Sequence, residues 1–323
     1  MSLAFLFPCQ GSQQPGMLSR LPNGDIKEYH LQAACRTLGR PITELESEEA
    51  LTGTEATQIA LYLAGVVGSK TLIRTGVKPS YCAGHSIGGF AAAVACGVLE
   101  FETGLEVVRH RAALMQSAFP NGYGMGVIVG ICEPSVNLML LELASAGRQV
   151  FLSIVNSRAQ VVITGKLCDV DAALGLARAN GARKAIRLNV AAPSHCVLLR
   201  DVANKLRGTF SGLKLRDPQI PYVANRTGRI LRDGHEIWED LMAAIEHPVR
   251  WYEMSTILVE AGVSIFIQMP PGRCLSDLIQ KAFPSVRSFA ADDHEISWLS
   301  EMYRYLSTKE PSAVFAGFEA GVW

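Results

Sequence analysis

The stretch AGHSIGGFAAAV at 83–94 constrains the fold of this chain more than any other part of it. A short apolar run precedes the serine, and an alanine-rich pattern with helical spacing follows at 87–96. GHSIG at 84–88 fits the G-x-S-x-G nucleophile elbow, a strained strand-to-helix turn that exposes a serine hydroxyl at the carboxyl edge of a sheet. Side chains in place of the glycines would collide with the neighbouring strand and helix. The pattern predicts an α/β fold with Ser86 as nucleophile; the alternative is a glycine-rich turn whose serine caps a helix.

Composition limits the classes of partner. The chain has 323 residues, 49% of them apolar, and its 30 basic residues balance 30 acidic ones. It is long enough to bury a large core, and it has no net field that would attract nucleic acid or an anionic membrane. The first apolar run stops at Pro8, and the stretch 59–73 is interrupted by polar residues. We therefore expect neither a signal peptide nor a membrane span.

Eight cysteines are scattered along the chain, without a CxxC pair or a His and Cys cluster of zinc-like spacing. We interpret them as reduced thiols. The sequence therefore predicts a cytoplasmic protein without a bound metal ion.

The hydrophobic pattern divides the chain into two kinds of region. Buried strands and long helices, which are typical of an α/β body, are predicted on both sides of the middle third. The predicted strands are 3–7, 81–83 and 264–268, and the predicted helices are 55–74, 87–96, 102–118, 195–206, 251–261 and 274–282.

The middle third has a different order of predicted elements, which is strand, helix, strand, strand, helix, strand. The predicted elements are 126–130, 133–146, 150–155, 160–164, 169–180 and 185–190, after a break at 120–122. This order predicts a ferredoxin-like α+β small subdomain at 124–190. We expect it to be inserted into an α/β-hydrolase-like body with a short parallel sheet, made of 1–123 and 191–323.

A nucleophilic serine needs a base. His195, in APSHC at 192–196, stands at the start of a predicted helix and follows the serine in the chain order of an α/β hydrolase. His85 adjoins the serine, but adjacent residues at an elbow point in different directions. We interpret the remaining histidines as structural or surface residues; they are His30, His110, His235, His247 and His294.

Two arginines lie on the predicted helix 102–118. Arg111 shares its face with Val108 and Met115, whereas Arg109 points elsewhere. An arginine on an apolar face needs an anion, because an unpaired buried charge costs several kcal/mol. A structural carboxylate and a substrate carboxylate both meet that need.

Five motifs, taken in order and spacing, resemble the malonyl-CoA:acyl-carrier-protein acyltransferases. They are FPCQGSQQPGM at 7–17, GHSIGG at 84–89, RHRAALMQ at 109–116, NSRAQVVITG at 156–165 and PSHC at 193–196. The resemblance implies a ping-pong transfer through a malonyl ester of Ser86, with malonyl-CoA as donor. The acceptor would be the phosphopantetheine-type thiol of an acyl-carrier protein, and no tightly bound cofactor would take part.

The resemblance also implies roles for single residues. His195 would be the general base and acid, oriented by a backbone carbonyl, and the backbone N–H groups of Gln10 and Ile87 would form the oxyanion hole. Arg111 would hold the malonyl carboxylate by a bidentate pair, and acetyl-CoA would leave that charge unpaired. The other residues expected at the substrate are Met115 as an apolar wall, Asn156, His85 and the side chain of Gln10.

Two single positions and one loop depart from the family pattern. Cys9 stands where glycine is usual, beside the expected oxyanion donor, and Gly89 replaces a frequent glutamate. The sequence MPPG at 269–272 varies the usual VGPG loop. None of them is the nucleophile, the base or the arginine, but Cys9 crowds the loop of Gln10.

Within the family, three segments look most like the malonyl transferase (epsilon) subunit of bacterial malonate decarboxylase. They are QQPGMLSRLP at 13–22, FPNGYGMG at 119–126 and MPPGRCLSDL at 269–278. The partner would then be a carrier subunit that bears a phosphoribosyl-dephospho-CoA group. The main alternative is a stand-alone transferase of fatty-acid synthesis.

Two further alternatives stay open, a serine esterase or thioesterase and a non-catalytic scaffold with the same fold. The basic residues Arg178, Arg183, Lys184 and Arg187 allow two interpretations, a docking site for an acidic carrier or a solvated charged face.

Overall fold

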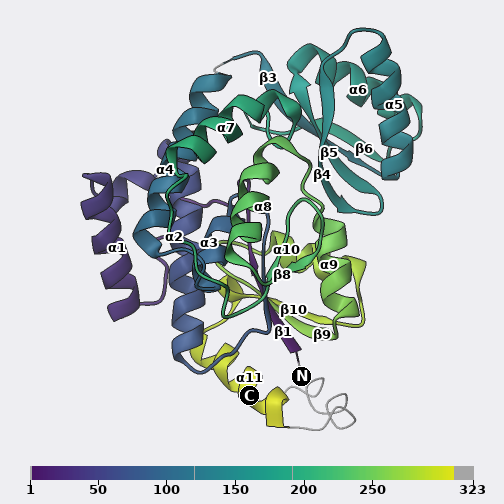
Figure 1. The fold of residues 1–323 in the computed structure, drawn as a ribbon. Helices are drawn as coiled ribbons and strands as arrows, with labels where there is room; N and C mark the ends of the chain where they lie inside the picture. The colour runs from purple at the N-terminus through teal and green to yellow at the C-terminus, as the bar shows by residue number, and fades with distance from the viewer. Residues whose placement is uncertain (1, 120, 191, 309–323) are drawn as a thin grey trace.

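Two sheets organise the chain in the computed structural model, which describes residues 2–119, 121–190 and 192–308 (Figure 1). The larger sheet has six strands in the order β10-β9-β1-β2-β7-β8. All neighbours in it are parallel except β7 and β8. The strands are β1 (Ser2–Phe7), β2 (Tyr81–Gly84), β7 (Tyr222–Val223), β8 (Ile230–Leu231), β9 (Val263–Gln268) and β10 (Arg287–Ala290).

Strand β1 is central and buried on both faces, as its uninterrupted apolar sequence predicts. Because side chains alternate along a strand, Phe5 and Phe7 join one core and Ala4 and Leu6 join the other. In Figure 1, α2, α3 and α4 lie on the first side of the sheet, and α9 and α10 lie on the second.

Helices surround this sheet. They are α1 (Asp25–Leu38), α2 (Thr54–Arg74), α3 (Gly88–Ala95), α4 (Phe101–Ala118), α7 (Arg200–Thr209), α8 (Gly234–Glu246), α9 (Trp251–Glu260), α10 (Cys274–Ala282) and α11 (Ile296–Thr308). Short 3-10 turns occur at Ile42–Leu45, Ala50–Thr52, Val197–Leu199 and Ala291–Asp293.

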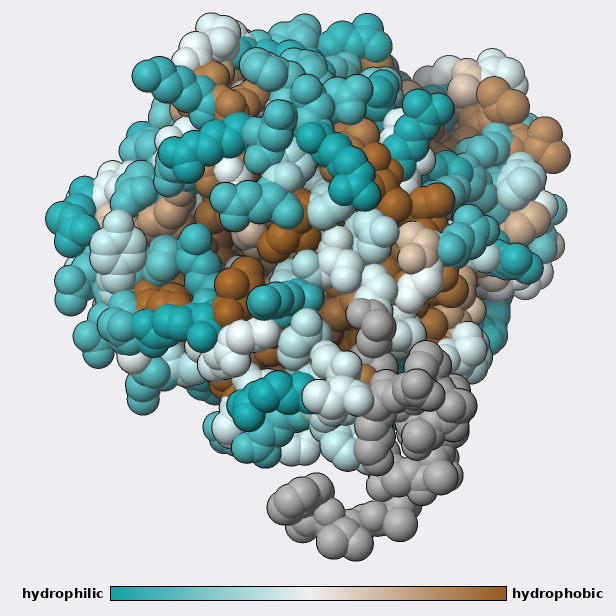
Figure 2. Space-filling view, turned by 60° about the horizontal axis from the view of Figure 1, so that its bottom comes forward, coloured by the Kyte–Doolittle hydropathy of each residue, from teal (hydrophilic) through white to brown (hydrophobic). Residues whose placement is uncertain are grey.

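Helix α2 is the one helix of the described residues that is long and apolar enough to span a membrane. Its most apolar window is 83% buried inside the fold, which is typical of a core helix. The molecular face in Figure 2 is largely hydrophilic, with apolar side chains in separate small groups.

The second sheet is small and antiparallel, in the order β4-β5-β3-β6. Its elements are β3 (Tyr123–Val129), α5 (Glu133–Ser145), β4 (Val150–Ser157), β5 (Gln160–Lys166), α6 (Leu167–Ala179) and β6 (Lys184–Arg187). Helices α5 and α6 close a core of their own against it. The predicted fold class, a parallel-sheet body with a separate ferredoxin-like unit, is confirmed.

The small sheet meets the body through β4, where Ile154 pairs with Val249 and the amide of Val155 donates to the Val249 carbonyl at 2.9 Å. The boundaries proposed between the two units remain a prediction. Ala191, Pro120 and the segment 309–323 lie outside the described residues.

Two predicted elements differ from the structure near the site. His195 does not begin a helix, because its φ of 59° is left-handed and α7 starts only at Arg200. Strand β6 ends at Arg187 rather than at residue 190. Leu188 still donates its backbone N–H to the Met125 carbonyl of β3 at 2.9 Å, and both Leu188 and Val190 line a cavity.

Candidate active site

Ser86 lies in the tight turn between β2 and α3 with a φ of 55°, a left-handed conformation that non-glycine residues rarely adopt. A Cβ on Gly84 would lie 2.3 Å from the backbone of Gly88, and one on Gly88 would lie 2.2 Å from the Phe7 carbonyl oxygen. Both glycines are therefore required by close backbone contacts with α3 and β1. This geometry is the nucleophile elbow that the sequence predicts.

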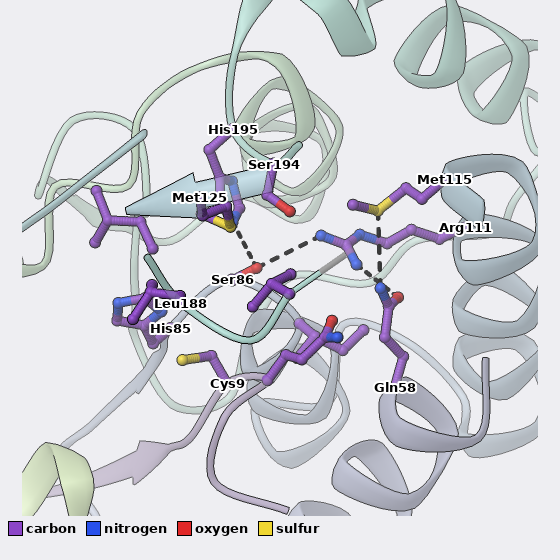
Figure 3. Close-up of a pocket in the computed structure, with 14 residues that line it drawn as sticks. Cys9, Gln58, His85, Ser86, Arg111, Met115, Met125, Leu188, Ser194 and His195 are labelled. Carbon is purple, nitrogen blue, oxygen red and sulfur yellow. Dashed lines mark hydrogen bonds between the residues drawn. The ribbon is translucent and has the colours of Figure 1, made fainter. Parts of the chain in front are cut away.

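The hydroxyl of Ser86 faces the imidazole of His195, with 2.7 Å between Oγ and Nε2 (Figure 3). On the other side of the ring, Nδ1 bonds to the backbone carbonyl of Ala244 on α8. Because a carbonyl only accepts, Nδ1 carries the proton and Nε2 is free to accept one from Ser86. The imidazole is thus oriented by a backbone oxygen, without a carboxylate.

Burial sets the charge of this histidine. His195 is 2% exposed. Burial first, and then the positive charge of Arg111, lower the pKa of His195 to about 3. The imidazole is therefore neutral at physiological pH, which is the state that a general base requires.

Arg111 projects from α4 to the same hydroxyl and is 3% exposed. Its Nη1 donates to Gln58 Oε1 at 2.6 Å, and its Nη2 lies 3.5 Å from Ser86 Oγ. Its Nε is buried and has no partner among the residues that the structure describes. Burial lowers the pKa of the guanidinium to about 10. No carboxylate pairs with it in the described part of the chain, so the structural anion considered from the sequence is not found there.

Arg109 behaves as its place on the helix predicts. It points to the surface, where its Nη2 lies 2.7 Å from Glu106 Oε2. Two arginines that are two residues apart on α4 thus have opposite surroundings, and within the described part of the chain the one facing the cavity has no anion.

His85 and Asn156 form a second buried contact. His85 Nε2 lies 3.2 Å from Asn156 Oδ1, and its Nδ1 has no partner among the described residues. Burial lowers the pKa of His85 to about 4, so this ring is also neutral. In Figure 3 its ring lies on the opposite side of Ser86 from Arg111. Asn156 therefore contacts His85 and is not among the residues that line the cavity.

The expected oxyanion donors border the same cavity. Gln10 and Ile87 both line it, and within residues 2–119, 121–190 and 192–308 neither backbone N–H has an acceptor. Cys9 lines it too, with its sulfur pointing away from Arg111 (Figure 3). Burial raises the pKa of the Cys9 thiol well above its usual range, so it stays protonated.

These groups surround a cavity of about 70 Å³. Its walls are mostly apolar and come from both units. The lining residues are Cys9, Gln10, Gln58, His85, Ser86, Ile87, Arg111, Met115, Met125, Ile154, Leu188, Val190, Ser194 and His195. The described residues hold no group of three or more His, Cys, Asp or Glu side chains that could bind a metal ion.

The sequence analysis missed Gln58, Met125, Ile154 and Leu188. Gln58 has a recognisable signal, because it is a polar side chain inside the apolar pattern of α2, and it is 1% exposed. The other three look like ordinary core residues of the small unit, and only the docking of that unit brings them to the cavity.

Comparison with known proteins agrees with this geometry. The family model described as acyl transferase domain matches residues 4–305. The malonyl CoA-acyl carrier protein transacylase of Bacillus subtilis is 33% identical over 298 residues, which cover 91% of this chain and 94% of the relative. The chain belongs to the acyl transferase family.

Two solved structures have the same fold. That of the malonyl CoA-acyl carrier protein transacylase of Coxiella burnetii has a TM-score of 0.90 at 31% identity, covering 95% of this chain and 98% of the other. A malonyl-transacylase in complex with a type II PKS acyl-carrier protein has a TM-score of 0.88 at 33% identity, covering 93% and 99%.

Proposed function

We propose that the chain moves a malonyl group from malonyl-CoA to the thiol of an acyl-carrier protein through an ester of Ser86. One observation carries the proposal: a serine bonded to a neutral histidine shares a cavity with a buried arginine that has no anion among the described residues. The names of the relatives support it, because they describe transfer of malonyl between CoA and a carrier protein.

In the first half-reaction, His195 Nε2 takes the proton of Ser86 as Oγ attacks the thioester carbonyl. The oxyanion that forms accepts hydrogen bonds from the free N–H groups of Gln10 and Ile87, each typically worth about a hundredfold to a thousandfold in rate. The C–S bond then breaks, and the CoA sulfur leaves with the proton from His195.

In the second half-reaction, His195 takes the proton of the carrier thiol, whose sulfur attacks the malonyl ester. The C–O bond breaks, and Ser86 recovers its proton from His195. The apolar walls from Met125, Ile154 and Leu188 exclude water from the ester between the two steps. The ester therefore persists until a carrier thiol attacks it.

Arg111 accounts for the choice of acyl group. A malonyl carboxylate can take a bidentate pair of N–H donors from the guanidinium, including the unused Nε. Acetyl would leave the buried charge unpaired, and sites of this kind reject such analogues strongly.

The alternatives differ in what accepts the acyl group. A serine esterase would use water, whereas this base is held by a carbonyl and faces an apolar cavity. A scaffold without activity would not need the aligned Ser86 and His195. Among transferases, the relatives' names favour the stand-alone enzyme over the malonate decarboxylase subunit that the three sequence segments suggested.

The carrier, its prosthetic group and the cellular site belong to this proposal. The relative solved with its carrier supports an acyl-carrier protein as partner, and the free state of the eight cysteines supports a cytoplasmic location. In the basic run, Arg187 pairs with Asp171, and Arg178 donates to the Ala185 carbonyl at 2.8 Å. Half of its charges therefore act within the small unit, which favours the solvated face over a docking site.

The test is to incubate the protein with labelled malonyl-CoA and to locate the label. We expect a malonyl ester on Ser86 that is absent in Ser86→Ala and present in Ser12→Ala, and that is discharged quickly by a carrier thiol. If the ester hydrolyses as fast without a thiol as with one, the transferase proposal is wrong.

A second assay separates the two kinds of carrier. We expect the loaded enzyme to discharge faster onto a phosphopantetheine carrier than onto one bearing phosphoribosyl-dephospho-CoA. The reverse preference would restore the malonate decarboxylase interpretation.

A further inference from the structure

The backbone N–H of the nucleophile itself has a side-chain partner from a distant part of the chain. Ser86 N–H donates to Oδ1 of Asn225 at 2.8 Å, across 139 positions of sequence. Asn225 follows β7, the strand beside β2, and its side chain is fully buried. The elbow is therefore held from the neighbouring strand as well as by its own glycines.

The other end of the same amide group is also engaged. Asn225 Nδ2 donates to the Gly84 carbonyl at 2.8 Å and to the Tyr222 hydroxyl at 3.1 Å. These partners fix the orientation of the amide, because a flip would set a donor against the Ser86 N–H and an oxygen against the Gly84 carbonyl. One side chain thus spans the elbow from the residue that ends β2 to the nucleophile.

Asn225 is in turn held by helix α8. Its backbone N–H donates to Asp240 Oδ2 at 2.8 Å, and the N–H of Arg226 donates to Oδ1 at 3.1 Å. Asp240 is 5% exposed. Four residues further along α8 is Ala244, whose carbonyl orients His195. Positions i and i+4 lie on one face of a helix, so one face of α8 connects to both the nucleophile and the base.

The space around this network depends on Gly89. A Cβ at that position would lie 2.8 Å from the Tyr222 hydroxyl and 3.0 Å from Leu241 Cδ2. The Tyr222 phenol therefore occupies room that a side chain at 89, such as the glutamate frequent in the family, would need. In this chain the Tyr222 hydroxyl has room at this position because residue 89 is a glycine.

We propose that Asn225 is a positioning residue, which holds the Ser86 peptide in its left-handed conformation and aligns the hydroxyl with His195 through the shared support of α8. The inference rests on the proposed function, because it takes Ser86 as the nucleophile. It concerns the rate at which Ser86 is acylated. Binding of malonyl-CoA depends on other residues.

The main variant is Asn225→Ala, compared with the wild-type protein by single-turnover acylation with malonyl-CoA. Because a displacement of about 1 Å at a reacting group typically costs about a hundredfold in rate, we expect a loss of that order in the acylation rate. The concentration of malonyl-CoA at half-saturation should change less than about threefold, since Arg111 and the cavity walls are untouched.

Asn225→Asp gives a readout that a merely structural role would not produce. The carboxylate keeps an acceptor for the Ser86 N–H but sets a second oxygen against the Gly84 carbonyl. When protonated, that oxygen can donate to it again. We therefore expect the ratio of variant to wild-type acylation rate to rise as the pH falls from about 8 to about 7. In this range His195 stays neutral, and the pH is above the pKa of about 6 to which burial raises the neighbouring Asp240.

Tyr222→Phe and Tyr62→Phe form a matched pair. Both remove a fully buried hydroxyl, and Tyr62 donates to the Phe101 carbonyl at 2.7 Å, away from the elbow. We expect both to lower thermal stability, but only Tyr222→Phe to slow acylation, by about threefold to tenfold, because one bond to Asn225 is lost.

The rates are compared per folded molecule, at a temperature well below the unfolding transition of each variant. An Asn225→Ala rate within threefold of wild type, or an Asn225→Asp ratio that does not change with pH, would overturn the positioning role. A wild-type protein that forms no ester at Ser86 would instead overturn the proposed function, so the two failures are distinguishable.

Discussion

The two sheets border one cavity, but they contribute opposite kinds of surface to it. The parallel sheet and the segments that follow its strands carry the polar groups, with Ser86 after β2 and Gln10 after β1. The antiparallel sheet contributes Met125 and Ile154, which have no group that can react. The body therefore contributes the polar groups, and the small unit contributes an apolar wall beside which electrostatic interactions are stronger than in water.

This difference explains how charged and neutral groups coexist at the site. In the body, His195 and Arg111 each have a backbone or amide partner that fixes their orientation. Burial is the first cause that lowers the pKa values of both groups. Variants of the body and of the small unit separate the two contributions.

Removal of the proposed base should have the largest effect. We expect His195→Ala to lower the rate of Ser86 acylation by about 10⁴-fold, because the serine then has no proton acceptor. The assay is single-turnover transfer from labelled malonyl-CoA.

The control is His30→Ala. His30 is also buried, and its Nδ1 contacts the Ile26 carbonyl at 2.7 Å, but it lies outside the cavity. This variant should lose stability and keep the acylation rate. A His195→Ala protein with more than about a tenth of wild-type activity would refute the assignment of the base.

Loss of the arginine should have the next largest effect. We expect Arg111→Met to lower the preference for malonyl-CoA over acetyl-CoA by about a thousandfold, which corresponds to about 4 kcal/mol for a buried ion pair. The measurement is the ratio of kcat/KM for the two donors.

Arg109→Met is the matched control on the same helix. Arg109 is half-buried and already paired with Glu106, so its loss should leave the ratio unchanged. If both variants lower the ratio equally, the selectivity comes from the helix as a whole and the carboxylate clamp is wrong.

Substitution of one glycine in each unit by alanine compares the rigidity of the two units. A Cβ on Gly88 would meet the Phe7 backbone oxygen at 2.2 Å, whereas one on Gly126 in the small sheet would meet the flexible Leu174 side chain at 3.0 Å. The backbone at the elbow cannot move aside as a flexible side chain can. Gly88→Ala should therefore lower the free energy of unfolding by about 3 kcal/mol. Gly126→Ala should cost about 1 kcal/mol or less.

Chemical denaturation of the two variants measures both values. Equal losses would show that the small unit is as tightly constrained as the elbow, and the contrast between the two sheets would then be wrong.

The sequence predicted the body's contribution better than the small unit's, for a physical reason. The elbow is a local device, since Gly84, Ser86 and Gly88 are fixed by one turn. Arg111 was also recognisable, because a charge on an apolar helical face is costly. Motif resemblance then pointed to His195, although its left-handed φ removed it from the predicted helix.

The other residues around Ser86 could not be predicted, because their positions depend on contacts between distant segments. Asn225 looks like an ordinary turn residue, and Asp240 and Ala244 lie in α8, a helix that the sequence analysis did not identify. Met125 follows a pattern typical of core strands. Only the packed fold shows that these residues surround one serine, because no local pattern encodes which strand or helix lies beside the elbow.

The smallest expected effect concerns the influence of Arg111 on the base. Its charge is the second cause, after burial, that lowers the pKa of His195 from an ordinary 6.5 to about 3. Because this folded-state value lies below the ordinary one, His195 contributes stability that is present above about pH 6.5 and is lost as the pH falls toward 3. In Arg111→Met the pKa of His195 should be higher, so less of that stability should be lost on acidification.

NMR titration of the His195 imidazole in Arg111→Met, with Arg109→Met as control, measures this change directly. An unchanged pKa would show that burial, and not the charge of Arg111, sets the state of the base. A raised pKa would have a consequence for the reaction, since a malonyl carboxylate paired with Arg111 neutralises the same charge. The bound substrate would then strengthen the base that activates Ser86, and acetyl-CoA, which lacks the carboxylate, would not.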